Sequence, residues 1–147
     1  MADDKVHPLE EKRVLKIEIL PEFSEITRLT HLLRDFFCER NFSVSHTNEI
    51  CLVIEELTAN TIMHGYKDVA LQNREKISVE VECSEAKKVS ILFKDAGVSF
   101  DPTLPRLSRE EGTIGGWGLM LVKKLMHSFK YERSGKYNIL KLSKKYW

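Results

Sequence analysis

The strongest constraint on the fold comes from two adjacent segments in which apolar and polar residues alternate. Residues 76–83 read KISVEVEC and residues 88–95 read KVSILFKD, with the turn SEAK between them. Alternation of this kind is typical of a strand that buries one face, and two such runs joined by a short polar turn predict a β-hairpin. We therefore expect a sheet with one face in water and one face covered by a second layer.

Three other segments have the apolar spacing of helices. Phenylalanine, isoleucine and leucine recur three or four residues apart from residue 23 to about residue 40, which predicts the first helix. The second helix is expected to be capped by Ser45 or Thr47 and to end at Gly65. The third covers about residues 119–126, after a run of glycines. These helices are the layer expected to cover the sheet.

Further strands complete the expected sheet. VLKIEIL, at residues 14–20, alternates before a proline, and FKYER and YNILKLS flank an SGK turn in a second hairpin at residues 129–143. Residues 95–117 are rich in Gly, Pro and Ser and are expected to form a long functional loop. The order β-α-α-β-β-loop-α-β-β predicts an α/β (α+β) two-layer sandwich, with a mixed, mostly antiparallel sheet and three helices on one face.

Length and composition narrow the class of protein. A chain of 147 residues is long enough for one core, so we expect a single domain over residues 1–147. The formal net charge of +1 gives no electrostatic footprint for nucleic acid or for an anionic membrane. No apolar run has the length of a transmembrane helix, and Cys38, Cys51 and Cys83 form no CxxC pair. We expect a cytoplasmic protein that binds neither nucleic acid nor membrane.

A line of polar residues lies on the second helix beside its apolar stripe. Glu56, Asn60 and His64 follow one another at four-residue spacing, so they stack on one helical face. Asparagine is a poor residue for the middle of a helix, which indicates another reason for Asn60. Its amide oxygen suits Mg²⁺, and Glu56, one turn away, could orient or deprotonate a nucleophile. Taken singly, each of the three is more simply explained as a solvated or helix-end residue, because exposed polar residues are common.

A second motif follows the strand at residues 88–95. In FKDAGVSFDP, Asp95 stands at the end of the strand and Gly97 comes two residues later. A carboxylate in this place can accept a hydrogen bond from an exocyclic amine, and a glycine lets the backbone approach a flat ring. Taken alone, the same residues favour a plain Asp-Ala-Gly turn at the end of a strand.

A third motif, GTIGGWGLMLVKKL, precedes and enters the third helix. Glycines at a helix N-terminus expose backbone N–H groups, and the helix dipole favours an anion there, so phosphates are expected at this point. The motif lacks GKS/T and does not follow a first strand as G-x-G-x-x-G, which excludes a P-loop and a Rossmann site. Together the three motifs predict a nucleotide site with a metal ligand, an adenine acceptor and a phosphate-binding turn.

The three motifs resemble the N, G1 and G2 boxes of a known ATPase superfamily. That superfamily is shared by gyrase, heat-shock chaperones, histidine kinases and mismatch-repair proteins. Within it, ELTANTIMHGY, DAGVSFDP and GGWGLMLVKKLMHSFKYERS most resemble the anti-sigma-factor serine/threonine kinases of bacterial partner-switching systems. The resemblance covers about residues 12–145 and keeps the motifs in their expected order. It implies the histidine-kinase-like ATPase (Bergerat) fold.

The resemblance also implies a role for each motif residue. ATP would bind with Mg²⁺ held by Asn60, with His64 near the phosphates and with Glu56 as the base that takes a proton from a serine hydroxyl. Asp95 would read adenine, with Gly97 close to the ring. The remaining contacts that it implies are Gly115, Gly116, Gly118 and Leu119 at the phosphates, and Arg106 and Arg109 from a mobile ATP lid between Asp101 and Gly115.

Partners follow from the same resemblance. The phosphoryl acceptor would be a serine of an anti-anti-sigma (STAS-type) protein, whose unphosphorylated form frees a sigma factor, and the kinase would be a homodimer. Three positions depart from the usual pattern of the family. His127 stands where an aspartate is usual, Trp117 lies inside the glycine turn, and Asn138 lies near the place of a threonine that helps to bind adenine. Asn138 could take over that contact.

Parts of the pattern also fit three other classes of protein. A nucleotide-gated binding module would use ATP to order the lid and to change its affinity for a partner, without phosphoryl transfer. A detached histidine-kinase catalytic domain would be expected beside a pair of dimerisation helices, and His31 lies in the first helix without that context. A two-layer interaction domain without nucleotide chemistry would require three ordered motifs to be coincidental.

Overall fold

The structure is a computed structural model that describes residues 13–84, 87–104 and 116–146 of the chain. Five strands form one sheet in the order β1-β2-β3-β5-β4, and three α-helices accompany it. In chain order the elements are β1 (Arg13–Ile19), α1 (Glu25–Glu39), α2 (Val44–Asn60), the π-helical turn η1 (Thr61–Gly65), the 3-10 turn η2 (Leu71–Asn73), β2 (Ile77–Cys83), β3 (Lys88–Asp95), α3 (Gly116–Leu125), β4 (Ser128–Ser134) and β5 (Tyr137–Lys145).

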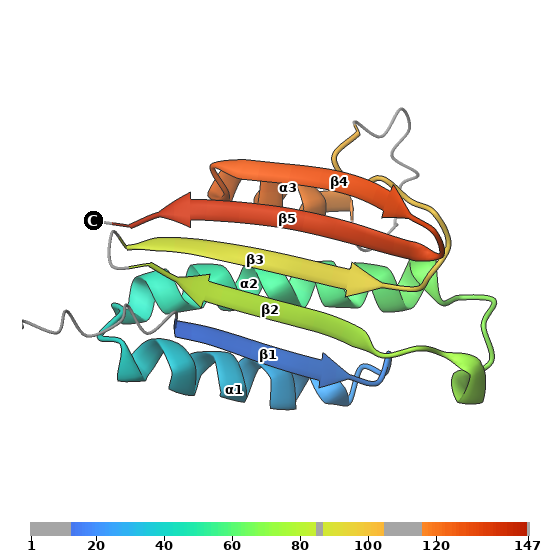
Figure 1. Ribbon diagram of the computed structural model, residues 1–147, viewed down its shortest axis with the longest axis horizontal. Coiled ribbons are helices and arrows are strands. Elements are labelled where there is room, and N and C mark those ends of the chain that lie inside the picture. The colour runs from blue at the N-terminus through green and yellow to red at the C-terminus, as the bar shows by residue number, and fades with distance from the viewer. Residues whose placement is uncertain (1–12, 85–86, 105–115, 147) are drawn as a thin grey trace, which may run out of the picture.

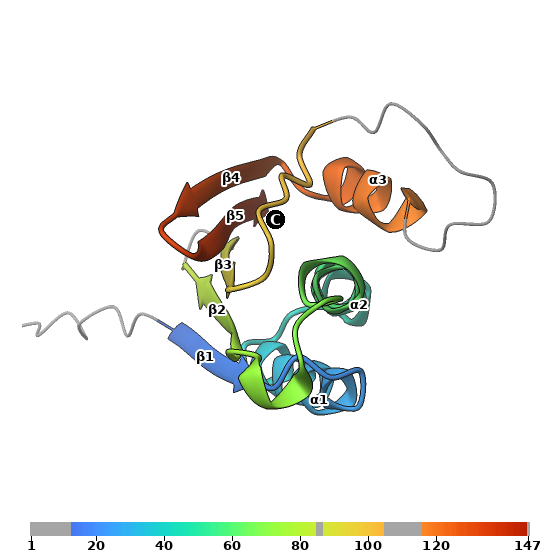
Figure 2. The ribbon, with the colours of Figure 1, turned by 90° about the vertical axis from the view of Figure 1, so that its right-hand side faces the viewer.

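The described elements form two layers, a sheet and a layer of helices (Figure 1). Figure 2 shows that α1, α2 and α3 lie on the same face of the sheet, with α2 between the other two. All the strand pairings are antiparallel. The predicted α/β two-layer sandwich with helices on one face is confirmed, and the described sheet is wholly rather than mostly antiparallel.

The apolar core lies between the two layers. In β2, Ile77, Val79 and Val81 are fully buried, while the residues between them are half-buried, as the alternating sequence predicts. From the helix layer, Ile50 and Ile54 of α2 are also fully buried. Burying one such side chain stabilises the fold by about 1.5–3 kcal/mol, so the central helix and the central strands hold the layers together.

Both ends of α2 differ from the sequence prediction. Ser43 caps the helix, because its extended backbone lets the hydroxyl accept the backbone N–H three residues later, at 3.0 Å. The expected caps, Ser45 and Thr47, lie inside the helix. At the other end the α-helix stops at Asn60, and η1 continues the chain as a wider turn to Gly65. Beyond Asn60, residues spaced four apart therefore no longer stack on the same helical face.

The third helix begins earlier than predicted. Its first residue is Gly116 rather than Leu119, so Gly118 lies in the first turn of α3 and not in a loop before it. The described part of the expected long loop, residues 96–104, contains neither helix nor strand. In the described ranges, no helix is both long enough and apolar enough to cross a membrane.

The register of the sheet brings distant residues to one place. Asp95, the last residue of β3, pairs with Asn138 on β5. The same end of β3 lies near the C-terminal end of α2, where η1 follows (Figure 1). A backbone hydrogen bond joins the two regions, because the Val98 N–H donates to the carbonyl of Gly65 at 2.9 Å.

Candidate functional site

Asp95 is a buried carboxylate at the end of β3. The residue is only 4% exposed. One carboxylate oxygen, Oδ1, accepts hydrogen bonds from the Gly97 N–H at 2.9 Å and from Asn138 Nδ2 at 3.0 Å. Within the described residues no donor contacts the other oxygen, Oδ2. That oxygen can therefore accept a hydrogen bond from an amine of a ligand.

Asn138 is held in one orientation by two side chains of β4. Its Oδ1 accepts a hydrogen bond from the Tyr131 hydroxyl at 2.7 Å and another from the Arg133 guanidinium at 3.1 Å. The amide nitrogen consequently faces Asp95, and it also donates to the carbonyl of Val98 at 2.9 Å. Sequence reasoning found Asn138 as a departure from a family pattern. It missed Tyr131 and Arg133, because only the pairing of β4 with β5 brings them here.

The surroundings of Asp95 change its affinity for a proton. Burial raises the pKa of the carboxyl above its ordinary value of 3.8. The hydrogen bonds from Asn138 and Gly97, and the positive charge of Arg133, act in the opposite direction and are smaller influences. A buried carboxylate of this kind gains from a ligand that donates a hydrogen bond to it.

Tyr66 fastens the loop after β3, a role that sequence reasoning missed. The residue is 1% exposed, and its hydroxyl accepts the Ala96 N–H at 2.8 Å while it donates to the carbonyl of Glu75 at 3.0 Å. Burial raises the pKa of Tyr66 to about 12, so the phenol keeps its proton at neutral pH. No periodicity marks this residue in the sequence, because both of its partners depend on the tertiary fold.

Gly97 is required by the backbone of the protein itself. A Cβ atom at Gly97 would lie 2.8 Å from the Cα, carbonyl carbon and oxygen of Gly65 in η1. From the sequence, this glycine was expected to let the backbone approach a flat ring. The structure gives a different reason, the close approach of η1, and the contact with a ring stays a prediction.

A small cavity lies between η1, the end of β3 and the loop that follows β3. Its lining includes Asn60, His64, Asp95, Asn138 and Phe100. The structure therefore brings two residues of the first sequence motif together with the acid of the second. The cavity measures about 20 Å³, which is room for about one water molecule. A purine ring is larger, so it can enter only if part of the lining moves.

Asn60 carries an unsatisfied atom at this cavity. The residue is 9% exposed, and its Oδ1 has no hydrogen-bond partner among the described residues. A buried acceptor in this state costs about 1–3 kcal/mol, and an amide oxygen is a suitable ligand for Mg²⁺. No group of three His, Cys, Asp or Glu residues in the described ranges could hold a metal ion. Asn60 thus fits a cation whose other ligands are phosphate oxygens and water.

Glu56 lies one turn before Asn60 and contacts the third motif. A Cβ atom at Gly118 would lie 2.0 Å from Glu56 Oε2, so the carboxylate packs directly against this glycine in the first turn of α3. Glu56 is half-buried and is not among the residues that line the small cavity. The structure therefore places the predicted base against the first turn of α3, one helical turn before the metal-ligand candidate.

The other residues that the sequence singled out do not line the small cavity or lie outside the described residues. Arg106, Arg109 and Gly115 lie outside the described residues, so their roles stay predictions. Leu119 is buried in the apolar core. His127 follows α3, where its Nδ1 accepts a backbone N–H of β5 at 3.2 Å, and it is not among the residues that line the cavity.

Comparison with known proteins gives one family match and several similar structures. The sequence model of the histidine kinase-like ATPase domain family matches residues 20–144. No curated protein matches the sequence at a significant level. One similar structure contains the RsbU and RsbW domains of a Mycobacterium tuberculosis protein, with 17% identity and a TM-score of 0.66. That match covers 90% of this chain and 32% of the other, so this chain spans about a third of its length.

Two further structures have the same fold. A chain of the SiaB–SiaC complex from Pseudomonas aeruginosa has 14% identity and a TM-score of 0.65, and the match covers 90% of both chains. The histidine kinase domain of a blue-light activated histidine kinase from Erythrobacter litoralis has 14% identity and a TM-score of 0.54. That match covers 82% of this chain and 59% of the other. The predicted histidine-kinase-like ATPase fold is confirmed.

Proposed function

The chain belongs to the histidine kinase-like ATPase domain family, and we propose that it is an ATP-dependent serine/threonine protein kinase that acts as an anti-sigma factor. Membership of this family implies ATP binding. One observation carries the proposal, because the unsatisfied Asn60 Oδ1 lies at the same cavity as the buried carboxylate of Asp95. A ligand with a cation-bound phosphate at one end and an exocyclic amine at the other would satisfy both groups.

The two ends of ATP have separate contacts in this proposal. Asp95 Oδ2 accepts a hydrogen bond from the adenine amino group, next to Gly97 and Asn138. Asn60 is the residue that would hold Mg²⁺, which neutralises phosphate charge when it is bound. The N-terminus of α3 presents backbone N–H groups to the phosphates. The further proposed nucleotide contacts are His64, Arg106, Arg109, Gly115, Gly116, Gly118 and Leu119.

Glu56 is the proposed general base. It accepts the proton of a serine hydroxyl while the serine oxygen attacks the γ-phosphorus of ATP. The bond from the γ-phosphorus to the oxygen that bridges the β- and γ-phosphates breaks, and ADP leaves. The contact between Glu56 and Gly118 supports this role, because it brings the carboxylate to the end of α3 that is proposed to bind phosphates.

The proposed acceptor is a serine of a STAS-type anti-anti-sigma protein, in a system where the kinase also binds a sigma factor. Support comes from the sequence motifs and from the likeness in fold to a structure that contains an RsbW domain and to a chain of the SiaB–SiaC complex. We also propose that the kinase is a homodimer, as the resemblance of the motifs implies.

Phosphoryl transfer is tested with labelled ATP, Mg²⁺ and each STAS-type protein of the organism. The wild-type chain is expected to transfer label to a serine. Glu56→Gln keeps the size of the side chain but cannot take a proton, so it is expected to slow transfer by about 10²–10⁴-fold with ATP affinity unchanged. Transfer at the normal rate by this variant would contradict the role of Glu56.

The size of the cavity favours a second candidate, an ATP-gated binding module. A cavity that holds about one water molecule must open when a nucleotide enters, and its lining includes residues of the loop after β3. A displaced loop can alter a surface that a partner protein binds, without phosphoryl transfer. This candidate predicts an ATP-dependent complex in which the partner gains no phosphate. An Asn60→Ala chain that still responds to ATP would contradict it.

A further inference from the structure

The two carboxylate oxygens of Asp95 differ in how many hydrogen bonds they can still accept. Each oxygen of an ionised carboxylate has about two acceptor sites. Asp95 Oδ1 already accepts from the Gly97 N–H at 2.9 Å and from Asn138 Nδ2 at 3.0 Å. No donor of the described residues contacts Oδ2. Oδ1 is therefore saturated, and Oδ2 is the oxygen that a ligand can use.

The orientation of the Asn138 amide is fixed at both of its ends. An arginine side chain carries donors and no acceptor, so the contact of 3.1 Å with Arg133 identifies the amide atom that faces it as the oxygen. At the other end the amide nitrogen faces three acceptors, which are Asp95 Oδ1 and the carbonyl oxygens of Gly97 at 3.3 Å and Val98 at 2.9 Å. A flipped amide would bring its oxygen against these acceptors, so Asn138 donates to Asp95.

Burial keeps this hydrogen bond in place when a ligand enters. Asn138 is 5% exposed and Asp95 is 4% exposed, so water has little access to either side chain. A buried polar group that loses its partner destabilises the fold. The Tyr131 hydroxyl, which donates to the amide oxygen at 2.7 Å, holds Asn138 from the side of β4. A ligand therefore meets Asp95 with Oδ1 already occupied.

The purine bases present different donors to a carboxylate. On its Watson–Crick edge adenine carries one donor group, the amine at C6, beside the acceptor N1. Guanine carries two adjacent donors on that edge, N1–H and the amine at C2, which together pair best with both oxygens of one carboxylate. A carboxylate with one free oxygen satisfies the amine of adenine and leaves one guanine donor without a partner.

We propose that Asn138 makes this site select adenine over guanine, because Asn138 and the Gly97 N–H fill Oδ1 and leave Asp95 with one acceptor oxygen for a nucleobase. Asp95 alone would not reject guanine, since a carboxylate with both oxygens free can accept both guanine donors. The inference rests on the proposed ATP site and adds the residue that determines its specificity. Asn138 acts through Asp95 and takes no part in phosphoryl transfer.

Calorimetric titration of ATP and GTP, with Mg²⁺, into variants of residue 138 in the full chain tests the proposal. Asn138→Val and Asn138→Thr have side chains of nearly the same shape, but only threonine has a hydroxyl that can donate to Oδ1. In the valine variant Oδ1 has a free acceptor site. The ratio of the GTP to the ATP dissociation constant should therefore fall about ten- to a hundredfold, the effect of one hydrogen bond to a charged group. The threonine variant should keep the wild-type ratio.

Inosine triphosphate isolates the second donor of guanine. Its base, hypoxanthine, keeps N1–H and lacks the amine at C2. The wild type should bind GTP no more tightly than inosine triphosphate, because the amine at C2 finds no free oxygen of Asp95. Asn138→Val should bind GTP at least about tenfold more tightly than inosine triphosphate. Equal affinities in the valine variant would contradict the proposal.

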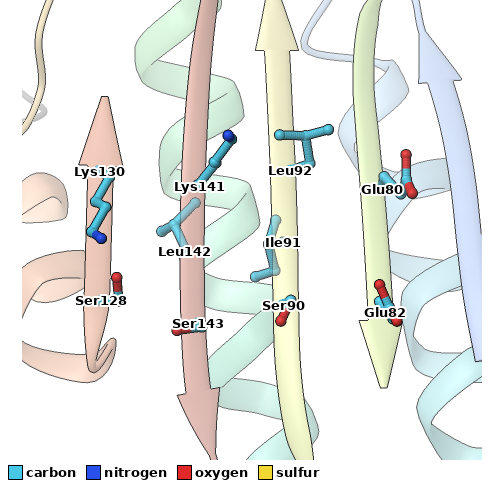
Figure 3. A pocket seen from close by; sticks show the side chains of 10 residues that line it. All are labelled: Glu80, Glu82, Ser90, Ile91, Leu92, Ser128, Lys130, Lys141, Leu142 and Ser143. Atoms are coloured by element: carbon cyan, nitrogen blue, oxygen red, sulfur yellow. The ribbon is translucent and has the colours of Figure 1, made fainter. Parts of the chain in front are cut away.

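The matched control lies on the opposite face of β5. Ser143 belongs to the open face of the sheet, where it borders a hollow of about 390 Å³ with Ser90 and Lys141, and the helices lie behind the strands (Figure 3). Ser143→Val adds the same side chain to the same strand on the side away from Asp95, so the ratio should stay at the wild-type value. Each ratio compares two nucleotides in one variant, so a partial loss of folded protein cancels.

The outcomes separate this inference from the proposed function. It is overturned if Asn138→Val keeps the wild-type ratio, or if the valine and threonine variants have the same ratio. If the valine variant does not fold, Asn138→Leu, which has nearly the volume of asparagine and no donor, takes its place with the same expected fall. A wild-type chain that binds no ATP contradicts the proposed function and this inference with it. A wild type that binds ATP, with an unchanged ratio in Asn138→Val, contradicts the inference alone.

Discussion

At the scale of single residues, the site consists of buried polar groups whose hydrogen bonds are incomplete. Asn60 has an amide oxygen without a partner among the described residues, and Asp95 uses one of its two carboxylate oxygens. Groups of this kind lower the stability of a fold, so their presence at one cavity points to a ligand that completes their hydrogen bonds and coordination.

The buried carboxylate of Asp95 predicts a dependence of stability on pH. Burial raises its pKa above the ordinary value of 3.8, so the folded chain keeps this proton up to a higher pH than the unfolded chain does. The contribution of Asp95 to stability is therefore fully present below 3.8 and is lost as the pH rises through the folded-state pKa. In urea unfolding, Asp95→Asn should gain stability relative to wild type as the pH rises from 3.8 through the folded-state pKa of Asp95. A constant or shrinking difference would contradict this assignment.

Tyr66 predicts a loss of stability that is localised to the loop after β3. Tyr66→Phe leaves the Ala96 N–H and the Glu75 carbonyl without their shared partner, and we expect it to lower the free energy of unfolding by about 1–3 kcal/mol. Tyr146→Phe is the control, because it removes a longer contact, 3.4 Å, with Glu49. Urea unfolding of both variants measures the difference. Equal losses would mean that the Tyr66 hydroxyl has no special role.

Sequence reasoning at this scale found residues whose own type and spacing are unusual. Asn60 stood out as an asparagine inside a helix, and Asp95 as an acid beside a glycine at the end of a strand. The network around Asn138 could not be found in this way. Its hydrogen bond to Asp95 joins residues 43 positions apart, and it exists only because of the register between β3 and β5.

At the scale of elements, the site depends on the close approach of η1 to the end of β3. Gly97 allows this approach, because a Cβ there would lie 2.8 Å from backbone atoms of Gly65, and the hydrogen bond from the Val98 N–H to the Gly65 carbonyl holds it. The helices and strands themselves were predictable, because their apolar spacing is local. The π-helical turn was not predictable from the sequence. It is accompanied by a contact with the end of β3, which depends on the tertiary fold, and not by a local sequence pattern.

Gly97→Ala tests this approach of two backbones. The new Cβ would lie 2.8 Å from backbone atoms of Gly65, which cannot rotate away as a side chain could, so we expect a loss of about 1–3 kcal/mol in the free energy of unfolding. Gly135→Ala is the control. That residue has a φ of +58° but no atoms within 4 Å of a Cβ, so its loss should be confined to about 1–2 kcal/mol of backbone strain.

ATP binding separates these two glycine variants more sharply than stability does. Gly97 adjoins Asp95, and a displaced η1 would also move Asn60 and His64 at the cavity. Gly97→Ala should therefore weaken ATP binding, whereas Gly135→Ala, in the turn between β4 and β5, should not. Equal ATP affinity in both variants would show that the η1 contact does not shape the cavity.

At the scale of the whole molecule, the sheet separates two surfaces. The helix side carries the cavity with Asn60 and Asp95, and the open side carries the hollow that Ser143 borders. The two-layer arrangement followed from the sequence, because alternating strands and amphipathic helices leave few ways to bury their apolar faces. The size of the cavity did not follow, since its lining comes from η1, the end of β3 and the loop after β3, which only the tertiary fold brings together.

Calorimetric titration tests the central claim, that ATP binds at the cavity shared by Asn60 and Asp95. ATP and GTP are titrated into the wild-type chain and into Asp95→Asn, with and without Mg²⁺. We expect the wild type to bind ATP in a Mg²⁺-dependent way and to discriminate against GTP. Asp95→Asn should bind ATP about ten- to a hundredfold more weakly, the effect of one lost hydrogen bond to a charged group. No binding by the wild type, or equal binding by the variant, would contradict the claim.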